Sequence, residues 1–274
     1  MFKDYHTHTL YSNHGQGHPR EMAAIAVERG MLALGFSEHF PLPEGFTEPS
    51  GGGANMHWNQ IEQYVQEVRE AQAEFGNRIK IMLGYEVDYL PAVDAQMRAN
   101  LATYPADYQV GSIHIVDRFR SNHENWLIDY TLEAFEEGLP ENGGPAQVYN
   151  RYYALVREFA QTHSHQIVGH LDLIKKFNLH NRLFDAKSED YLAQVEATLD
   201  VLKTTDKIIE INTAGLFKEI GELYPSEPIL QMILQRRIPI CLSSDAHHPE
   251  HVGREFSATW DKLVKIGFEQ LTGL

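Results

Sequence analysis

Short apolar runs alternate with amphipathic segments along the whole chain. Seven runs are continuously apolar and rich in β-branched and aromatic residues, a pattern typical of strands buried on both faces. They cover residues 2–5, 32–36, 79–85, 108–113, 167–169, 207–211 and 238–242. Six segments repeat apolar positions at the helical period and cover residues 19–29, 59–75, 146–162, 188–202, 225–235 and 259–266. This alternation predicts a parallel sheet, either a closed βα barrel or a doubly wound sheet.

Local signals support the helix limits and a single domain. Pro19 stands at the start of the first helical segment and Gly30 just past its end, which is the usual asymmetry of helix termini. No low-complexity tract or linker divides the chain, so we expect one domain over residues 1–274. Two long connections, Pro41–Met56 and Asp117–Leu127, predict functional or mobile loops, the first a glycine-rich flexible lid.

Composition narrows the class of protein. The chain of 274 residues has 23 Lys+Arg and 38 Asp+Glu, a net charge of −15 that disfavours a generic nucleic-acid binder. A single cysteine, Cys241, excludes an intrachain disulfide framework and a cysteine-rich zinc module. Met1–Leu10 lacks the pattern of a signal peptide, and no apolar stretch is long enough for a membrane span. We therefore expect a soluble, cytoplasmic protein.

Metal-binding residue types follow nearly every predicted strand. In strand order, these residues are His6 and His8, Glu38 and His39, Glu86, His114, His170 and Asp172, and finally Asp245 and His247. Active-site residues of a parallel barrel come from the carboxyl ends of its strands. Each residue alone has a simpler explanation, such as a helix cap or a turn. Chance placement on five or six strands would bury several ionisable groups at a cost of several kcal/mol each, so a metal site is favoured.

The residue types indicate which metals and which reaction. Imidazole and carboxylate ligands without thiolate are typical of Zn, Mn, Fe or Co. The candidates are too many for one ion, which favours two or three ions with a bridging carboxylate. Such clusters activate water and neutralise the oxygens of a phosphate ester, so hydrolysis of a phosphate ester is the predicted reaction.

Six motifs resemble those of the PHP (polymerase and histidinol phosphatase) superfamily. They are DYHTHTLYSNHG (4–15), GFSEHF (35–40), LGYEVDYLP (83–91), GSIHIVD (111–117), GHLDLIKKF (169–177) and SSDAHHPEHVG (243–253). Within the superfamily, the GFSEHF and GYEVDYLP forms are most similar to the monofunctional histidinol-phosphate phosphatases. The motifs occur in order over nearly the whole chain.

The resemblance implies a distorted (β/α)7 barrel that holds three divalent ions, Zn, Mn or Fe. It implies that the first ion is held by His6, His8, Glu86 and Asp245. Glu86 would bridge to a second ion, bound also by His114 and His170. The third ion would be held by His14, His39 and His247, of which His14 was not found from the strand ends.

The resemblance further implies hydrolysis of L-histidinol phosphate to L-histidinol and phosphate, a step of histidine biosynthesis. A metal-bridging hydroxide held by Glu86, Asp245 and His170 would attack phosphorus. Four basic residues are candidates for contacting the substrate phosphate: Lys175, Lys176, Arg254 and Arg118. A solvated basic turn explains the two lysines equally well. Asp172 and His248 are candidates for protonating the leaving oxygen, and Glu38 for orienting a ligand.

Two other functions stay open from the sequence alone. The first is a phosphoesterase of the same superfamily acting on a nucleotide or another small phosphate ester. The net charge of −15 and the lack of basic, aromatic-interleaved stretches count against a polynucleotide but not against a mononucleotide. The second is a non-catalytic metal-handling protein, which is disfavoured because the candidate ligands are not in an exposed histidine-rich tract. We expect no membrane partner, and the sequence leaves the oligomeric state open.

Overall fold

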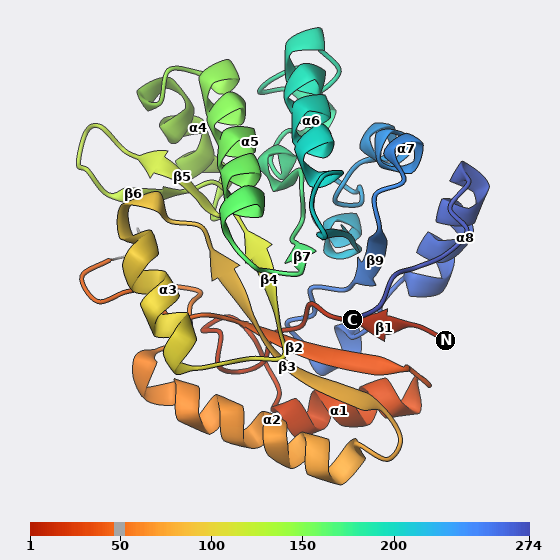
Figure 1. Ribbon diagram of the computed structural model, residues 1–274. Helices are drawn as coiled ribbons and strands as arrows, with labels where there is room; N and C mark the ends of the chain where they lie inside the picture. Colours follow the sequence, from red (N-terminus) through yellow and green to blue (C-terminus); the bar gives the residue numbers. More distant parts are fainter. Residues whose placement is uncertain (47–52) are drawn as a thin grey trace.

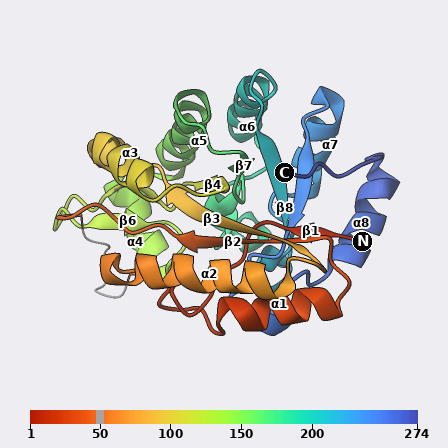
Figure 2. The same ribbon diagram turned by 60° about the horizontal axis from the view of Figure 1, so that its bottom comes forward.

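A seven-stranded parallel sheet forms the centre of the protein. The computed structural model describes residues 1–46 and 53–274. The strands are β1 (Lys3–Asp4), β2 (Ala33–His39), β3 (Lys80–Asp88), β4 (Tyr108–Ser112), β7 (Ile167–Val168), β8 (Ile208–Asn212) and β9 (Ile240–Ser243). They are adjacent in the order β1-β2-β3-β4-β7-β8-β9, and every pairing is parallel (Figures 1 and 2). All seven predicted strands are therefore confirmed.

The sheet curls into a nearly closed barrel. Residues just past β1 and β9 meet across the gap in a parallel bridge between Thr7 and Ala246. There the backbone N–H of His8 donates to the carbonyl of Ala246 at 2.7 Å. The strand–helix alternation also allowed a doubly wound open sheet, and the closure between β1 and β9 excludes that fold.

Alternation along the strands separates two apolar layers. On β8, Ile208 packs inside the barrel with Tyr5, Tyr108 and Cys241. Its neighbour Ile209 belongs to the larger cluster between the sheet and the surrounding helices. Both faces of the sheet are buried, which explains why the strand sequences are continuously apolar.

Helices surround the barrel (Figures 1 and 2), and the described residues form eight of them. They are α1 (Pro19–Glu28), α2 (Ile61–Phe75), α3 (Asp94–Thr103), α4 (Leu132–Glu141), α5 (Pro145–Thr162), α6 (Glu189–Leu202), α7 (Glu227–Arg236) and α8 (Phe256–Ile266). Short 3-10 turns lie at Trp58–Gln60, Pro91–Val93, Leu173–Lys175, Leu179–Asn181, Ala214–Phe217 and Pro249–His251. Of the described helices, none combines the length and apolar character that membrane crossing requires. The six predicted helices are confirmed, whereas α3 and α4 were not predicted.

The second long connection differs from the prediction. Instead of an irregular loop over Asp117–Leu127, the chain forms an antiparallel hairpin of β5 (Ile115–Arg118) and β6 (Asn125–Leu127). Trp126 anchors the hairpin: its side chain is fully buried and its indole N–H donates to the carbonyl of Ala134 on α4 at 3.0 Å. This contact with the helix that follows, eight residues further along the chain, stabilises the hairpin. Of the predicted lid Pro41–Met56, residues 47–52 lie outside the described part of the chain.

Two glycines allow the inner layer of the barrel to pack around one tyrosine. At Gly84 on β3, an added Cβ would lie 2.3 Å from Cε1 of Tyr108 and 2.8 Å from the carbonyl oxygen of Phe36. Gly35 on β2 faces the same ring, with Tyr108 Oη 2.4 Å from its added Cβ. The Tyr108 hydroxyl donates to the carbonyl of Tyr5 at 2.6 Å, so the ring has little room to move.

We expect Gly84→Ala to lower the free energy of unfolding by about 1–3 kcal/mol, because the added methyl overpacks the barrel interior. Urea denaturation at equilibrium measures the change. In a Tyr108→Leu background the same substitution should cost less, since the ring edge it meets is absent. An unchanged midpoint for Gly84→Ala would contradict this account of the inner layer.

Candidate metal centre

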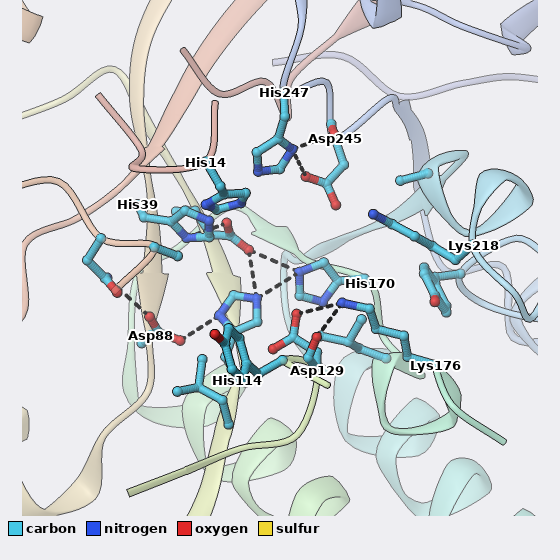
Figure 3. Close-up of a pocket in the computed structure, with 18 of the residues that line it drawn as sticks. His14, His39, Asp88, His114, Asp129, His170, Lys176, Lys218, Asp245 and His247 are labelled. Atoms are coloured by element: carbon cyan, nitrogen blue, oxygen red, sulfur yellow. Dashed lines mark hydrogen bonds and ion pairs between the residues drawn. The ribbon is translucent and has the colours of Figure 1, made fainter. Parts of the chain in front are cut away.

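The carboxyl ends of the strands bring the predicted ligands to one end of the barrel. His39 ends β2, Glu86 lies on β3, and His170 and Asp245 follow β7 and β9. These side chains line a cavity of about 620 Å³, which is within the range of small-ligand pockets. Figure 3 shows the imidazoles of His39, His114 and His170 pointing toward one another.

Glu86 is at the centre of the cluster and faces imidazoles on both sides. Its Oε1 lies 3.0 Å from His170 Nε2 and 3.5 Å from His114 Nε2. Its Oε2 lies 3.2 Å from His6 Nε2 and 3.4 Å from His8 Nε2. The carboxylate is 1% exposed, so these ring nitrogens replace the water that would otherwise solvate it. One oxygen faces His114 and His170 and the other faces His6 and His8, as expected of a carboxylate that would bridge two metal ions.

Asp245 completes the group around His6 and His8. Its Oδ1 lies 3.3 Å from His8 Nε2 and 3.7 Å from His6 Nε2. The residue has a φ of +49°, a left-handed conformation that is uncommon for a non-glycine residue. Strained backbone of this kind is concentrated at functional sites. Here it turns the carboxylate toward the imidazoles while the next residue, Ala246, bridges to Thr7.

A second set of imidazoles stacks beside this group. The rings of His14 and His247 are 4.3 Å apart, and those of His8 and His247 are 4.2 Å apart. His39 lies next to His14, with ring centroids 5.6 Å apart, and its Nδ1 is 3.0 Å from Glu86 Oε2. His14 comes from the loop after β1 rather than from a strand end, so the structure gathers ligands from both kinds of position.

Carboxylates stand behind three of the imidazoles. Asp88 Oδ1 lies 2.7 Å from His114 Nδ1, and Glu210 Oε2 lies 2.8 Å from His6 Nδ1. Glu38 Oε1 is 3.4 Å from His8 Nδ1, which is long for a hydrogen bond. Such carboxylates orient metal-binding imidazoles in many proteins. Asp88 was missed in the sequence, although its position two residues after Glu86 puts it on the same side of β3.

The donor atoms fit divalent ions of the predicted kind. The described residues contain four groups of three donor residues, and within each group the donor atoms lie within 4.8 Å of one another. All the predicted ligands except His14 belong to at least one of these groups. Nε2 of His6 and Nε2 of His247 are buried without a hydrogen-bond partner. A buried imidazole nitrogen with no partner is costly unless something else binds it, and a metal ion would do so. The donor groups include no thiolate, since Cys241, the one cysteine, packs in the inner layer.

The pKa values show that the cluster is electrostatically coupled. Burial raises the pKa of Glu86, but His6, His39 and His114 outweigh it and hold the value well below the usual range. Burial lowers the pKa of His114, yet Asp88 and Glu86 raise it to about 10. For His8, burial is likewise outweighed by Asp245 and Glu38, which raise its pKa to about 9. In contrast, burial and His39 lower the pKa of His14 to about 4, which keeps that ring neutral.

Comparison with known proteins assigns the chain to a family. A profile of the PHP domain matches residues 4–214. The chain belongs to the PHP domain family. A curated protein of Deinococcus radiodurans, named as a probable histidinol-phosphatase, is 31% identical over 98% of this chain and 95% of its own length. The histidinol-phosphatase of Bacillus subtilis is 29% identical over 93% of this chain and 97% of its own length.

Solved structures share the fold. A candidate histidinol phosphatase from Listeria monocytogenes superposes with a TM-score of 0.85 at 27% identity, covering 93% of this chain and 99% of that one. A histidinol phosphate phosphatase from Lactococcus lactis, solved with zinc, L-histidinol and phosphate, has a TM-score of 0.72 at 20% identity, covering 98% of this chain and 95% of that one. The PHP barrel predicted from the motifs is thus confirmed.

Two of the predicted phosphate-binding residues of this PHP domain line the cavity. Arg254 places its guanidinium carbon 3.2 Å from the centroid of the Phe217 ring, and its Nε is buried without a hydrogen-bond partner. Lys176 Nζ lies 3.2 Å from Asp129 Oδ2 at the cavity wall (Figure 3). Lys218, which no motif indicated, also lines the cavity. It follows β8 in a segment without a sequence signal, so only the fold brings it to the site.

Four other candidates lie outside the described cavity lining. Lys175 is buried between Asp172 and Glu222, at 3.2 and 2.6 Å, and the carboxylate of Asp172 is fully buried in this pair. Arg118 lies on the β5–β6 hairpin, where its Nε donates to Asn125 Oδ1 at 3.1 Å. His248 caps the turn Pro249–His251, and its neighbour His251 reaches the cavity instead. Lys175 and Asp172 therefore have a structural role as a buried ion pair.

We expect the metal-free protein to lose stability as the pH rises from about 6.5 toward 10. His8 and His114 have folded pKa values of about 9 and about 10, against 6.5 for a free imidazole. Their stabilising contribution is therefore complete below pH 6.5 and is lost as the pH rises through the folded values. The lowered pKa of His14 acts mainly below this window, because the folded ring is neutral throughout and the unfolded ring loses its proton near pH 6.5.

With zinc bound, the same imidazoles would be neutral ligands in the folded state, so this loss should be much smaller. Thermal unfolding of chelator-treated and zinc-loaded protein across this pH range measures both curves. A metal-free protein whose stability is flat or increases over the range would contradict the electrostatic description of the site.

Proposed function

We propose that this PHP domain is a metal-dependent phosphomonoesterase that hydrolyses L-histidinol phosphate to L-histidinol and phosphate. The observation that carries the proposal is the buried Glu86 carboxylate, whose two oxygens face separate groups of imidazoles inside a cavity with basic side chains at its wall. The curated relatives named as histidinol-phosphatases match almost the whole chain, which supports the substrate.

We assign the ligands to three ions, Zn, Mn or Fe, as the family resemblance implies. His6, His8, Glu86 and Asp245 would hold the first ion, and Glu86, His114 and His170 the second. Distances of 3.0–3.7 Å between these donor atoms support both assignments. His14, His39 and His247 would hold the third ion, supported by the stacking of His14 on His247.

Substrate contacts follow from the residues of the cavity. We propose that Arg254 and Lys218 bind the phosphate, because both line the cavity and neither is paired with a carboxylate in the described structure. Lys176 is a third candidate and is held by Asp129. The exposed aromatic rings of Tyr130 and Phe217 offer apolar contact for the imidazole of histidinol.

The chain itself would position and neutralise the reacting groups. Bound divalent ions would supply an activated water nucleophile and Lewis acidity toward the phosphate oxygens. Glu86, Asp245 and His170 would hold those ions, and the cationic side chains would offset the charge of the phosphate. No side chain of the described structure is needed as a nucleophile. We place the enzyme in the cytoplasm, in line with its single reduced cysteine, Cys241.

The deciding experiment offers the purified protein, loaded with Mn or Zn, three substrates at equal concentration: histidinol phosphate, AMP and a short oligonucleotide. We expect kcat/KM to be highest for histidinol phosphate. Elemental analysis of the same preparation should give more than one transition-metal equivalent per chain. A higher kcat/KM for AMP or the oligonucleotide would contradict histidinol phosphate as the substrate. Less than one metal equivalent per chain would contradict a cluster of several ions.

We expect Arg254→Met to lower kcat/KM for histidinol phosphate by about 10- to 1000-fold, since a charge-assisted contact to the phosphate is lost. Arg118→Met is the matched control, because Arg118 lies on the hairpin outside the cavity lining. Steady-state kinetics on both variants, with metal content checked, give the comparison. Equal decreases of kcat/KM in the two variants would show that Arg254 does not contact the phosphate.

A further inference from the structure

Glu210 is a buried carboxylate that the ligand assignment leaves unused. It lies in the middle of β8, where Ile208 packs inside the barrel and Ile209 and Ile211 pack on the outer side. Because side chains alternate along a strand, Glu210 and Asn212 point into the barrel interior. Glu210 is fully buried, and it is absent from both the cavity lining and the donor groups of the described residues.

Both oxygens of Glu210 hold predicted ligand residues. Oε2 lies 2.8 Å from Nδ1 of His6, which follows β1. Oε1 accepts the backbone N–H of His170, which follows β7, at 2.6 Å. One carboxylate on β8 thereby connects two ligand residues that come from distant parts of the sequence.

The contact with His6 selects one tautomer of its ring. An ionised carboxylate only accepts hydrogen bonds, so the proton of the neutral imidazole lies on Nδ1 and is donated to Glu210. The lone pair of Nε2 is then free. That atom is buried without a hydrogen-bond partner and lies 3.2 Å from Glu86 Oε2 and 3.7 Å from Asp245 Oδ1. The ring therefore presents its ligand atom toward the two carboxylates.

Asn212 connects Glu210 to Asp245, a third predicted ligand. Its Nδ2 donates to Glu210 Oε1 at 2.9 Å and lies 3.2 Å from Asp245 Oδ2. Its Oδ1 accepts the backbone N–H of Ala214 at 2.9 Å, which fixes the amide orientation. The strand end without a metal-binding side chain thus carries an amide that supports Asp245.

We propose that Glu210 is a positioning residue of the metal centre. It holds His6 in the tautomer that binds metal through Nε2 and fixes the His170 backbone, without itself being a ligand. This inference rests on the metal centre of the proposed function but not on the identity of the substrate.

Glu210→Gln is a sharp test because it keeps the shape and changes one hydrogen-bond role. The amide oxygen would take the Oε1 place, where two N–H donors from His170 and Asn212 converge. The amide NH2 would then face His6 Nδ1, which must accept, so the ring proton moves to Nε2. The substitution is therefore expected to block the ligand atom of His6.

The experiment measures zinc affinity by competition with a chromophoric chelator, and the unfolding midpoint of the same preparations before and after zinc removal. Asp172→Asn is the matched control: it also changes a fully buried carboxylate to an amide, but that carboxylate contacts Lys175 and Ser226. We expect Glu210→Gln to weaken zinc binding by about 10- to 100-fold, as loss of a carboxylate behind a ligand usually does. Asp172→Asn should stay within about twofold of the parent affinity.

A loss below about tenfold in Glu210→Gln, or an equal loss in Asp172→Asn, would overturn the proposal and leave Glu210 with a purely structural role. Should Glu210→Gln fail to fold, Glu210→Asp gives the answer. It keeps an acceptor for His6 but is one methylene too short to reach both partners, so zinc binding should weaken by about threefold or more. A smaller change in Glu210→Asp would equally overturn the proposal. Since zinc alone is the probe, an error in the proposed substrate leaves this result unaffected.

Discussion

The site depends on placing one carboxylate, Glu86, in the middle of imidazoles where water is excluded. Burial alone would disfavour its charge, and the surrounding rings of His6, His39 and His114 reverse that effect, so its pKa lies well below the usual range. The arrangement is costly unless every partner is held in place, because an unpaired buried charge destabilises a protein by several kcal/mol. The barrel meets this requirement by bringing strand ends together from almost the whole chain.

The same requirement explains the polar residues behind the ligands. Asp88, Glu38 and Glu210 each lie next to the Nδ1 of a different imidazole, and Glu38 is itself held by Thr9 through its hydroxyl at 2.5 Å and its backbone N–H at 2.9 Å. The hydrogen bonds of Asp88 and Glu210 give the rings of His114 and His6 fixed orientations before any ion arrives. Precise ligand geometry of this kind depends on supporting contacts as much as on the ligands themselves.

The inner layer of the barrel serves a different purpose from the metal end. Tyr5, Tyr108, Ile167 and Cys241 fill the interior with apolar contacts, and glycines on β2 and β3 leave room for the Tyr108 ring. One end of the barrel interior is therefore tightly packed while the other remains open as the cavity. This division is common in parallel barrels, in which stability and chemistry belong to opposite ends.

Much of this protein was determined by local sequence alone. Continuous apolar runs define strands buried on both faces, and residues at i and i+2 share a side of a strand, so the seven strands and most ligands were predictable from spacing. Tertiary structure decided the rest. Lys175 pairs with Glu222, Lys218 and Arg254 line the same cavity as the ligands, and Glu210 contacts His6; each of these contacts joins residues far apart in the chain. Such contacts depend on how strands curl and helices pack, which no local pattern of residues encodes.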